Sequence, residues 1–293
     1  MRDRDLYTEV TEGLIEALEQ GVRPWAPSWA SANKLPPLPR RHCGRPYSGI
    51  NILILWIQAQ ERGYTHPAWM TYRQAIELGG RVRKGERGCA VVFASTFTRE
   101  ERTETGEAVQ RAVPFLRSYT VFNVEQIDGL PAKRGDAFER NTDDAKTISD
   151  AELLFGATGA TFRHGGTRCF YDRASDSITL PSPSDFITAA AYTSAKAHEL
   201  VHWTGHGSRC NREFGKRFGD DAYAFEELVA EMGAAFLCAE LGLQNETRED
   251  HAGYLWHWLQ VLRRDKRAIF TAATKAQEAM DFILSGGLAI VAT

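Results

Sequence analysis

The chain has 293 residues, of which 43% are hydrophobic and 25% charged, and it carries a formal net charge of −3. This balance is typical of a soluble globular protein with room for two domains, and it excludes disordered and fibrous chains. The longest apolar run, residues 50–57, is far shorter than the roughly 20 residues that a membrane span needs. Five scattered cysteines without a CxxC pair, and a start without a signal peptide, predict a cytoplasmic protein with reduced thiols and no membrane partner.

The first part of the chain predicts an α+β domain over residues 1–127. Apolar periodicity, possible N-caps and glycine stops predict helices at residues 3–20, 49–62 and 71–79. Two strands joined by a charged hairpin are predicted near residues 88–97 and 112–124.

Positive charge and aromatic rings are concentrated in residues 20–95, which hold 11 Lys and Arg against 3 Asp and Glu, with seven Trp and Tyr. Single-stranded nucleic acid is bound by cations that contact its phosphates and by rings that stack on its bases. We therefore predict a domain that binds single-stranded DNA, with the glycine-rich loop at residues 79–88 as the strongest phosphate-contact candidate. The predicted contacts are Arg23, Trp25, Arg45, Tyr47, Arg81, Arg83, Lys84 and Arg87. The alternatives are that the rings belong to the core, as we expect for Trp56 and Trp69, and that the loop carries only solvated charge.

The second part of the chain predicts a different architecture. Residues 128–150 are polar and poor in apolar side chains, which predicts a linker. Residues 151–293 predict a mainly helical domain with a small antiparallel sheet. We expect a helix at residues 150–159, strands near 161–180, and four helices at about 187–205, 221–241, 250–264 and 266–285.

One short segment of this domain is a candidate for binding an extended substrate. Residues 176–180 alternate polar and apolar side chains and stop at Pro181, which predicts an edge strand. An edge strand can bind a peptide by adding it to the sheet, and Ile178 and Leu180 would then lie at the substrate. The alternative is an ordinary edge strand without a partner.

The most informative motif is HELVH at residues 198–202, within a predicted helix. Residues four apart share a helix face, so His198 and His202 can bind one metal ion together, as in the HExxH motif of zinc peptidases. Glu199 is then the catalytic carboxylate that takes a proton from the attacking water. The expected ion is Zn²⁺, with Mn²⁺ or another divalent ion as alternatives.

A third ligand is expected from the helix at residues 221–241, which contains three neighbouring acids. Glu227 and Glu231 are four apart and share a face. We predict Glu227 as the ligand and Glu231 as an acceptor that orients a ligand histidine through its other ring nitrogen. Glu226 points roughly 100° away and is predicted to be a solvated charge, which is also the alternative for the other two acids.

His206 continues the spacing of the two histidines, but residues eight apart on one helix are about 12 Å apart along the axis and cannot reach one ion. We therefore expect His206 to cap the helix, to support a ligand or to stabilise the transition state. His206, Tyr192 and Tyr223 are the nearby groups that could bind an oxyanion, with none of them favoured.

Several ordered motifs of the chain resemble ArdC-type antirestriction proteins. They are RPW at residues 23–25, RPYSGIN at 45–51, RKGE at 83–86, YTVFNVEQ at 119–126, HELVHWTGH at 198–206 and EELVAE at 226–231. This resemblance covers nearly the whole chain. It implies an N-terminal single-stranded DNA-binding domain, a C-terminal zincin-like metallopeptidase domain, and protection of plasmid and other mobile-element DNA from host restriction enzymes. His198, His202 and Glu227 match the family's metal residues, and Glu199 matches its catalytic carboxylate.

The combined interpretation is an antirestriction protein that binds single-stranded DNA non-specifically and carries a zinc peptidase acting on a peptide or protein of unknown identity. Two alternatives stay open. The chain is a DNA-binding module with a structural or inactive metal site, or a DNA-dependent metalloprotease that acts on DNA-bound proteins. The sequence does not indicate an oligomeric state.

Overall fold

The computed structural model describes residues 6–25, 36–102, 108–131, 144–215, 221–243 and 255–287. The predicted hairpin turn and most of the predicted linker lie outside these residues. The chain packs as two compact units. The helical unit is formed by Met1–Leu38, Ser48–Trp56 and Glu139–Thr293, and the ribbon unit by Pro39–Tyr47 and Ile57–Phe138. These units differ from the predicted division at residues 127 and 150, because two early segments pack with the carboxyl-terminal part of the chain.

The amino-terminal helix, α1 (Leu6–Glu19), is the clearest of these segments. It buries Leu14 and Leu18, and the hydroxyl of Thr11 donates to the backbone oxygen of Lys266 at 2.7 Å. The amphipathic pattern of the helix predicts its apolar face but carries no information about the distant segment that covers that face.

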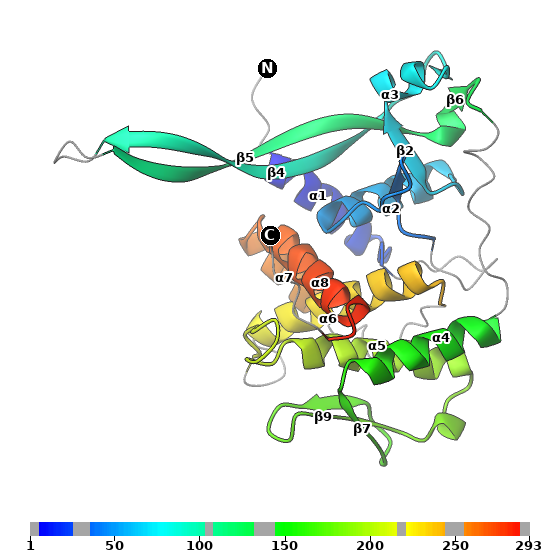
Figure 1. The fold of residues 1–293 in the computed structure, drawn as a ribbon, viewed down its shortest axis with the longest axis vertical. Coiled ribbons are helices and arrows are strands. Elements are labelled where there is room, and N and C mark those ends of the chain that lie inside the picture. The colour runs from blue at the N-terminus through cyan, green and yellow to red at the C-terminus, as the bar shows by residue number, and fades with distance from the viewer. Residues whose placement is uncertain are drawn as a thin grey trace. The chain divides into compact units, whose positions relative to one another are not determined.

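The ribbon unit is built from β1 (Arg40–Arg41), β2 (Ala68–Thr71), α3 (Tyr72–Glu77), β3 (Arg81–Val82), β4 (Cys89–Arg102), β5 (Ala108–Asn123), η1 (Val124–Gln126) and β6 (Ile127–Asp128). Its main sheet has the strand order β1-β2-β5-β4, in which β1 and β2 are parallel and the other pairs antiparallel. β4 and β5 continue as a long two-stranded ribbon (Figure 1).

Local sequence explains the short elements of the ribbon unit. The side chain of Thr71 accepts a hydrogen bond from the backbone N–H of Gln74, and this capping box starts α3. Met70, Ala75 and Ile127 form a small buried cluster beneath α3 and the β3–β6 pair. Trp69 is buried, as predicted.

The helical unit contains α1, the first part of α2 (Ile50–Arg62), α4 (Asp144–Ala157), β7 (Thr161–His164), β8 (Phe170–Asp172), β9 (Ser177–Leu180), α5 (Ala189–Thr204), α6 (Asp221–Leu241), α7 (Leu255–Arg264) and α8 (Ala268–Leu284). The predicted helices are confirmed, although α4 begins inside the segment that was predicted to be a linker. Trp56, on α2, is buried as predicted.

The small sheet of the helical unit corrects two predictions: it is mixed rather than antiparallel, and β9 is not at its edge. Its strand order is β7-β9-β8, so β9 is the central strand rather than an edge, and its pairing with β7 is parallel. Ile178 and Leu180 are fully buried. Alternation of polar and apolar residues predicts a strand with one buried face, but it does not show whether both edges of that strand are paired. The prediction that β9 binds a substrate peptide at a sheet edge is therefore wrong, because the backbone of β9 is already paired on both sides.

Helices α5 and α6 of this unit are in close contact. α6 packs against both α5 and α8 (Figure 1), and nearly all of its side chains from Ala224 onward are buried. A Cβ atom on Gly233 of α6 would lie 2.9 and 3.0 Å from the two methyl carbons of Val201 on α5. Only glycine permits this approach, which brings the HELVH helix against the acidic turn of α6. Within the described residues, no helix is long and apolar enough to cross a membrane.

Candidate functional site

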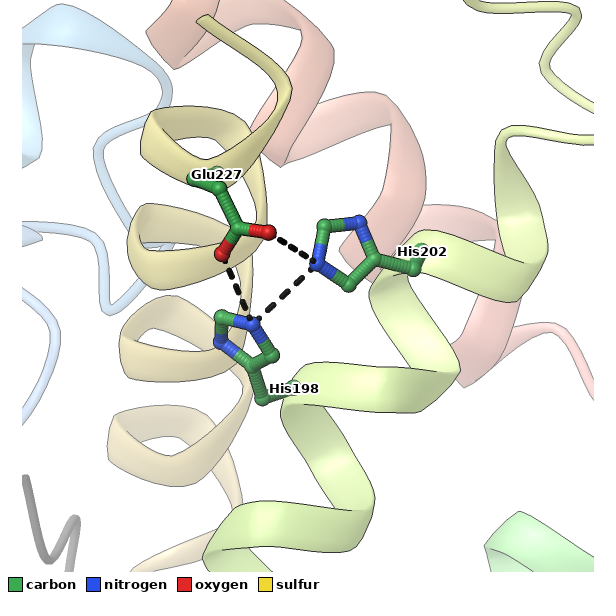
Figure 2. Close-up of side chains that lie close together, drawn as sticks. All are labelled: His198, His202 and Glu227. Carbon is green, nitrogen blue, oxygen red and sulfur yellow. Dashed lines mark hydrogen bonds and ion pairs between the residues drawn. The ribbon is translucent and has the colours of Figure 1, made fainter. Parts of the chain in front are cut away.

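The two histidines of α5 and one glutamate of α6 converge on a single point (Figure 2). Nε2 of His198 lies 3.2 Å from Nε2 of His202 and 3.5 Å from Oε2 of Glu227. Nε2 of His202 lies 3.6 Å from Oε1 of Glu227. All three side chains are buried. Among the described residues, they form the group whose ligand atoms are close enough together to hold one metal ion.

The donor atoms fit a divalent metal ion. Tetrahedral ligands about 2.0–2.2 Å from one ion lie roughly 3.3–3.6 Å from each other. The two Nε2 atoms are close to that spacing, and each has a different oxygen of Glu227 at 3.5 or 3.6 Å. Two imidazoles and one carboxylate are also the donor set of catalytic metal sites that keep a further position open.

The pKa values of His202 and Glu227 are both shifted by their neighbours. Burial lowers the pKa of His202, but the charge of Glu227 and the hydrogen bond to Glu226 outweigh burial and raise this pKa to about 10. Burial raises the pKa of Glu227, but the neighbouring imidazoles hold this pKa well below its usual range. The carboxylate therefore stays ionised and attracts positive charge, which a proton on His202 or a divalent cation can supply.

Glu226 is a buried neighbour of His202 that the sequence analysis did not predict. It was predicted to be a solvated charge, yet only 3% of it is exposed. Its Oε1 lies 3.2 Å from Nδ1 of His202, and it forms a buried ion pair with Arg212. The prediction was wrong because α6 has no solvent-facing side at this position, so a carboxylate rotated away from Glu227 is still inside the protein. A helical run without a polar face was the available signal.

Glu231 lies beside the other ligand, but less closely. Its Oε1 is 3.8 Å from Nδ1 of His198, which is an ion-pair distance and not a hydrogen bond. Its predicted role of orienting a ligand histidine stays a prediction.

The predicted catalytic residues occupy three different settings. Glu199 is buried in α5 directly after His198. Tyr223 is half-buried on α6, one turn before Glu227. His206 follows the end of α5 at Gly205, and its Nδ1 lies 2.8 Å from the hydroxyl of Ser208.

Neither His206 nor Tyr192 belongs to the described metal-ligating group. Helix α5 ends at Thr204, so His206 lies beyond the helix that carries the two histidines. The hydroxyl of Tyr192 lies 3.1 Å from Nε2 of His164, on the sheet side of α5.

Two of the predicted DNA contacts are wrong. Trp25 is fully buried in the helical unit and packs edge-on against Trp258 with ring centroids 5.8 Å apart. Tyr47 is buried beside Arg41, and burial raises the pKa of its hydroxyl to about 12. A ring without an exposed face cannot stack on a base. Neighbouring prolines and basic residues therefore did not distinguish a surface ring from a core ring.

The predicted basic contacts differ in exposure and in their ion pairs. Arg45, Arg81, Lys84 and Arg87 are exposed in the ribbon unit, whereas Arg23 is half-buried in the helical unit. Arg83 is held by Glu86 at 2.9 Å, by Asp128 at 3.4 Å and by the backbone oxygen of Glu125 at 2.5 Å. Its hydrogen bonds, chiefly with Glu86, raise its pKa.

Exposed rings of the ribbon unit were missed by the sequence analysis. Phe93 on β4 and Tyr119 on β5 are 47% and 45% exposed, and their ring centroids lie 6.3 Å apart. Val91 is opposite Tyr119 and Phe93 is opposite Arg117, so the two rings and the guanidinium share one face of the sheet. Residue 119 lay outside the basic window, and the predicted strand pairing was not detailed enough to place it beside Phe93.

Charge separates along the two packing units. The ribbon unit holds 15 Lys and Arg against 10 Asp and Glu, and the helical unit holds 20 against 28. Nine of the eleven basic residues noted within residues 20–95 belong to the ribbon unit, which also carries the exposed rings of Phe93 and Tyr119.

Fold and site together define a two-part protein with a buried His–His–Glu cluster that could hold a metal ion, and known proteins share both parts. Residues 149–275 match the family described as zincin-like metallopeptidase, and residues 4–122 match the family described as the N-terminal domain of the anti-restriction factor ArdC. The metal-free crystal structure of the antirestriction protein ArdC of plasmid R388 is similar at a TM-score of 0.81 and 43% identity, covering 97% of this chain and 98% of that one. The Mn(II)-bound structure of ArdC gives a TM-score of 0.80 and 41% identity, covering 98% and 100%.

Sequence relatives extend this result. An uncharacterised protein of Sinorhizobium fredii, y4eC, is 38% identical, with 95% of this chain matching 91% of that protein. A DNA primase of Escherichia coli, TraC, is 37% identical over 96% of this chain, which spans only 27% of the primase. The chain belongs to the ArdC antirestriction family, as its motifs predicted, and its α+β fold with a zincin-like domain is confirmed.

Proposed function

We propose that this chain is a metal-dependent peptidase whose ribbon unit binds single-stranded DNA, and that it protects incoming plasmid DNA from host restriction during conjugation. The convergence of His198, His202 and Glu227 carries the peptidase part of the proposal. Family membership supports the antirestriction part. We also propose a cytoplasmic location and a peptide or protein substrate.

The proposed ion is Zn²⁺, held by the two imidazole Nε2 atoms and the carboxylate of Glu227, with Mn²⁺ as the alternative that the ArdC structure of plasmid R388 supports. When bound, the ion supplies Lewis acidity, which polarises the peptide carbonyl and acidifies water. The ionised carboxylate of Glu227 favours a cation at this site.

We assign the proton transfers to Glu199. Its carboxylate takes a proton from water as the oxygen–carbon bond forms, and it delivers that proton to the amide nitrogen as the carbon–nitrogen bond breaks. Its burial next to a ligand histidine supports this role, since a proton held in a low-dielectric site is not lost to bulk water. Tyr223, one turn from Glu227, is the better-placed candidate for binding the oxyanion, because His206 follows the end of the helix.

For DNA, the exposed Phe93 and Tyr119 replace the buried rings Trp25 and Tyr47 as the proposed stacking residues. Each ring offers a sequence-independent surface for an unpaired base. The guanidinium of Arg117 on the same strand face supplies a cation for the phosphate backbone.

We retain four exposed cations of the ribbon unit as proposed phosphate contacts: Arg45, Arg81, Lys84 and Arg87. Arg83 is removed from this set because its guanidinium already bonds two carboxylates and a carbonyl. Arg23 stays a prediction.

A restriction-protection assay tests the proposal as a whole. It compares wild type with Glu199→Gln and with a triple Arg81→Gln, Lys84→Gln, Arg87→Gln variant. We expect both variants to lose protection. Loss in the charge variant alone would replace the proposal with a DNA-binding module that has an inactive metal site. If Glu199→Gln no longer cleaves DNA-bound proteins but still protects DNA fully from restriction, the DNA-dependent protease is favoured.

A further inference from the structure

Arg212, in the segment that follows α5, is buried almost completely and binds three groups at once. Its Nε and Nη2 atoms donate to both carboxylate oxygens of Glu226, at 3.0 Å to Oε2 and 2.8 Å to Oε1. Nη2 also donates to the backbone oxygen of Val201 at 2.6 Å, and Nη1 donates to the hydroxyl of Thr204 at 2.8 Å. The arginine therefore ties the last turn of α5 to the acidic turn of α6.

The carboxylate that Arg212 grips is also the partner of a proposed ligand. Oε1 of Glu226 lies 3.2 Å from Nδ1 of His202. An ionised carboxylate only accepts hydrogen bonds, so Nδ1 of His202 carries a hydrogen, and Nε2 is the ring nitrogen left to bind a metal ion. A buried carboxylate requires a cation to stay ionised, and Arg212 is the cation that bonds it in a bidentate manner.

The backbone of the segment is shaped to deliver this arginine. The N–H of Arg212 donates to the oxygen of Gly205 at 2.9 Å. A Cβ atom on Gly205 would lie 2.6 Å from the ring of Phe214 and 3.0 Å from Nη2 of Arg212. A side chain at residue 205 would therefore force the Phe214 ring and the Arg212 guanidinium to move.

We propose that Arg212 is a positioning residue for the metal centre: it fixes Glu226, and through Glu226 it fixes the ring orientation and tautomer of His202. This inference rests on the metal centre proposed above.

Zinc affinity of the full chain, measured by competition with a chelator, tests the proposal without reference to peptidase activity. We expect Arg212→Gln to bind Zn²⁺ about 10–100-fold more weakly than wild type, and Arg212→Lys to be weakened in the same direction, because lysine keeps the charge but not the fork. The control is Arg209→Gln. Arg209 lies in the same segment but binds Asp176, Tyr171 and the backbone of Trp203, so its loss should leave zinc affinity unchanged.

A second measurement follows the tautomer directly. Histidine ¹⁵N spectra of the zinc-loaded wild type should show the Nδ1 proton of His202 in a hydrogen bond, and this signal should weaken in Arg212→Lys. If Arg212→Gln does not fold, Arg212→Lys carries both measurements. A folded Arg212→Lys protein with wild-type zinc affinity and an unchanged Nδ1 signal would overturn the proposal. A wild-type chain that binds no metal would instead contradict the metal centre itself.

Discussion

Replacing Gly233 with alanine tests whether the close approach of α5 and α6 builds the metal site. A Cβ atom at this position would lie 2.9 and 3.0 Å from the methyl carbons of buried Val201. Normal carbon–carbon contact starts near 3.5 Å, so the helices must separate by about 0.5 Å. Valine cannot move aside easily, because its branched side chain has one preferred rotamer in a helix.

Two opposing terms set the stability of Gly233→Ala. Alanine in a helix interior gains about 1 kcal/mol over glycine. Overpacking a dense core costs about 1–3 kcal/mol. The control is Gly13→Ala in α1, where a new Cβ meets nothing within 4 Å and only the gain applies. We therefore expect the free energies of unfolding of the two variants to differ by about 1–3 kcal/mol, with Gly233→Ala the less stable.

Denaturant unfolding of the metal-free proteins measures this difference, and a zinc titration measures its effect on the site. Val201 precedes His202, so a shift of about 0.5 Å exceeds the roughly 0.2 Å tolerance of metal–ligand distances and should lower zinc affinity. Adding Val201→Ala to Gly233→Ala removes the overlapping methyls, so the double variant should be more stable than the sum of the single effects predicts. The reasoning is refuted if Gly233→Ala gains as much stability as Gly13→Ala.

Three other predictions concern catalysis, DNA and pH. Glu199→Gln should keep zinc binding but reduce peptide hydrolysis by about 10²–10⁴-fold, the usual contribution of a general base; unchanged turnover would remove Glu199 from this role. Tyr119→Ala should weaken single-stranded DNA binding by about 1–3 kcal/mol in a fluorescence anisotropy titration, whereas Tyr47→Phe should not, and equal effects would contradict the surface assignment. Hydrogen bonds from Arg209 hold the pKa of Asp176 below its usual range, so this carboxylate stabilises the fold above about pH 4 and the contribution is lost as pH falls through the lowered pKa. Asp176→Asn should flatten this part of the stability–pH profile, and an unchanged slope would count against the pair.

The parts of the site that depend on helix spacing could be predicted from sequence. His198, His202 and Glu227 follow from the four-residue repeat of a helix and from one further acidic helix. Glu226 could not be placed in this way, because its environment depends on which sides of α6 are covered. The contacts of Arg212 could not be predicted either, since they depend on a segment that folds back after Gly205.

The errors in the remaining predictions share a physical cause. Alternation in β9 describes one buried face but not the number of paired edges. Aromatic residues such as Trp25 and Tyr47 are typical of stacking surfaces, but their rings are equally stabilised by burial in the core. Helix boundaries and caps are local properties, whereas burial and strand position are decided by distant parts of the chain.

Zinc titration of Glu227→Gln tests the central claim most directly. Glu213, an exposed glutamate outside the ligand group, supplies the control variant Glu213→Gln. Wild type and Glu213→Gln should each bind one ion per chain with equal affinity, and Glu227→Gln should bind at least about tenfold more weakly. Equal binding by Glu227→Gln and wild type would contradict the metal centre formed by α5 and α6.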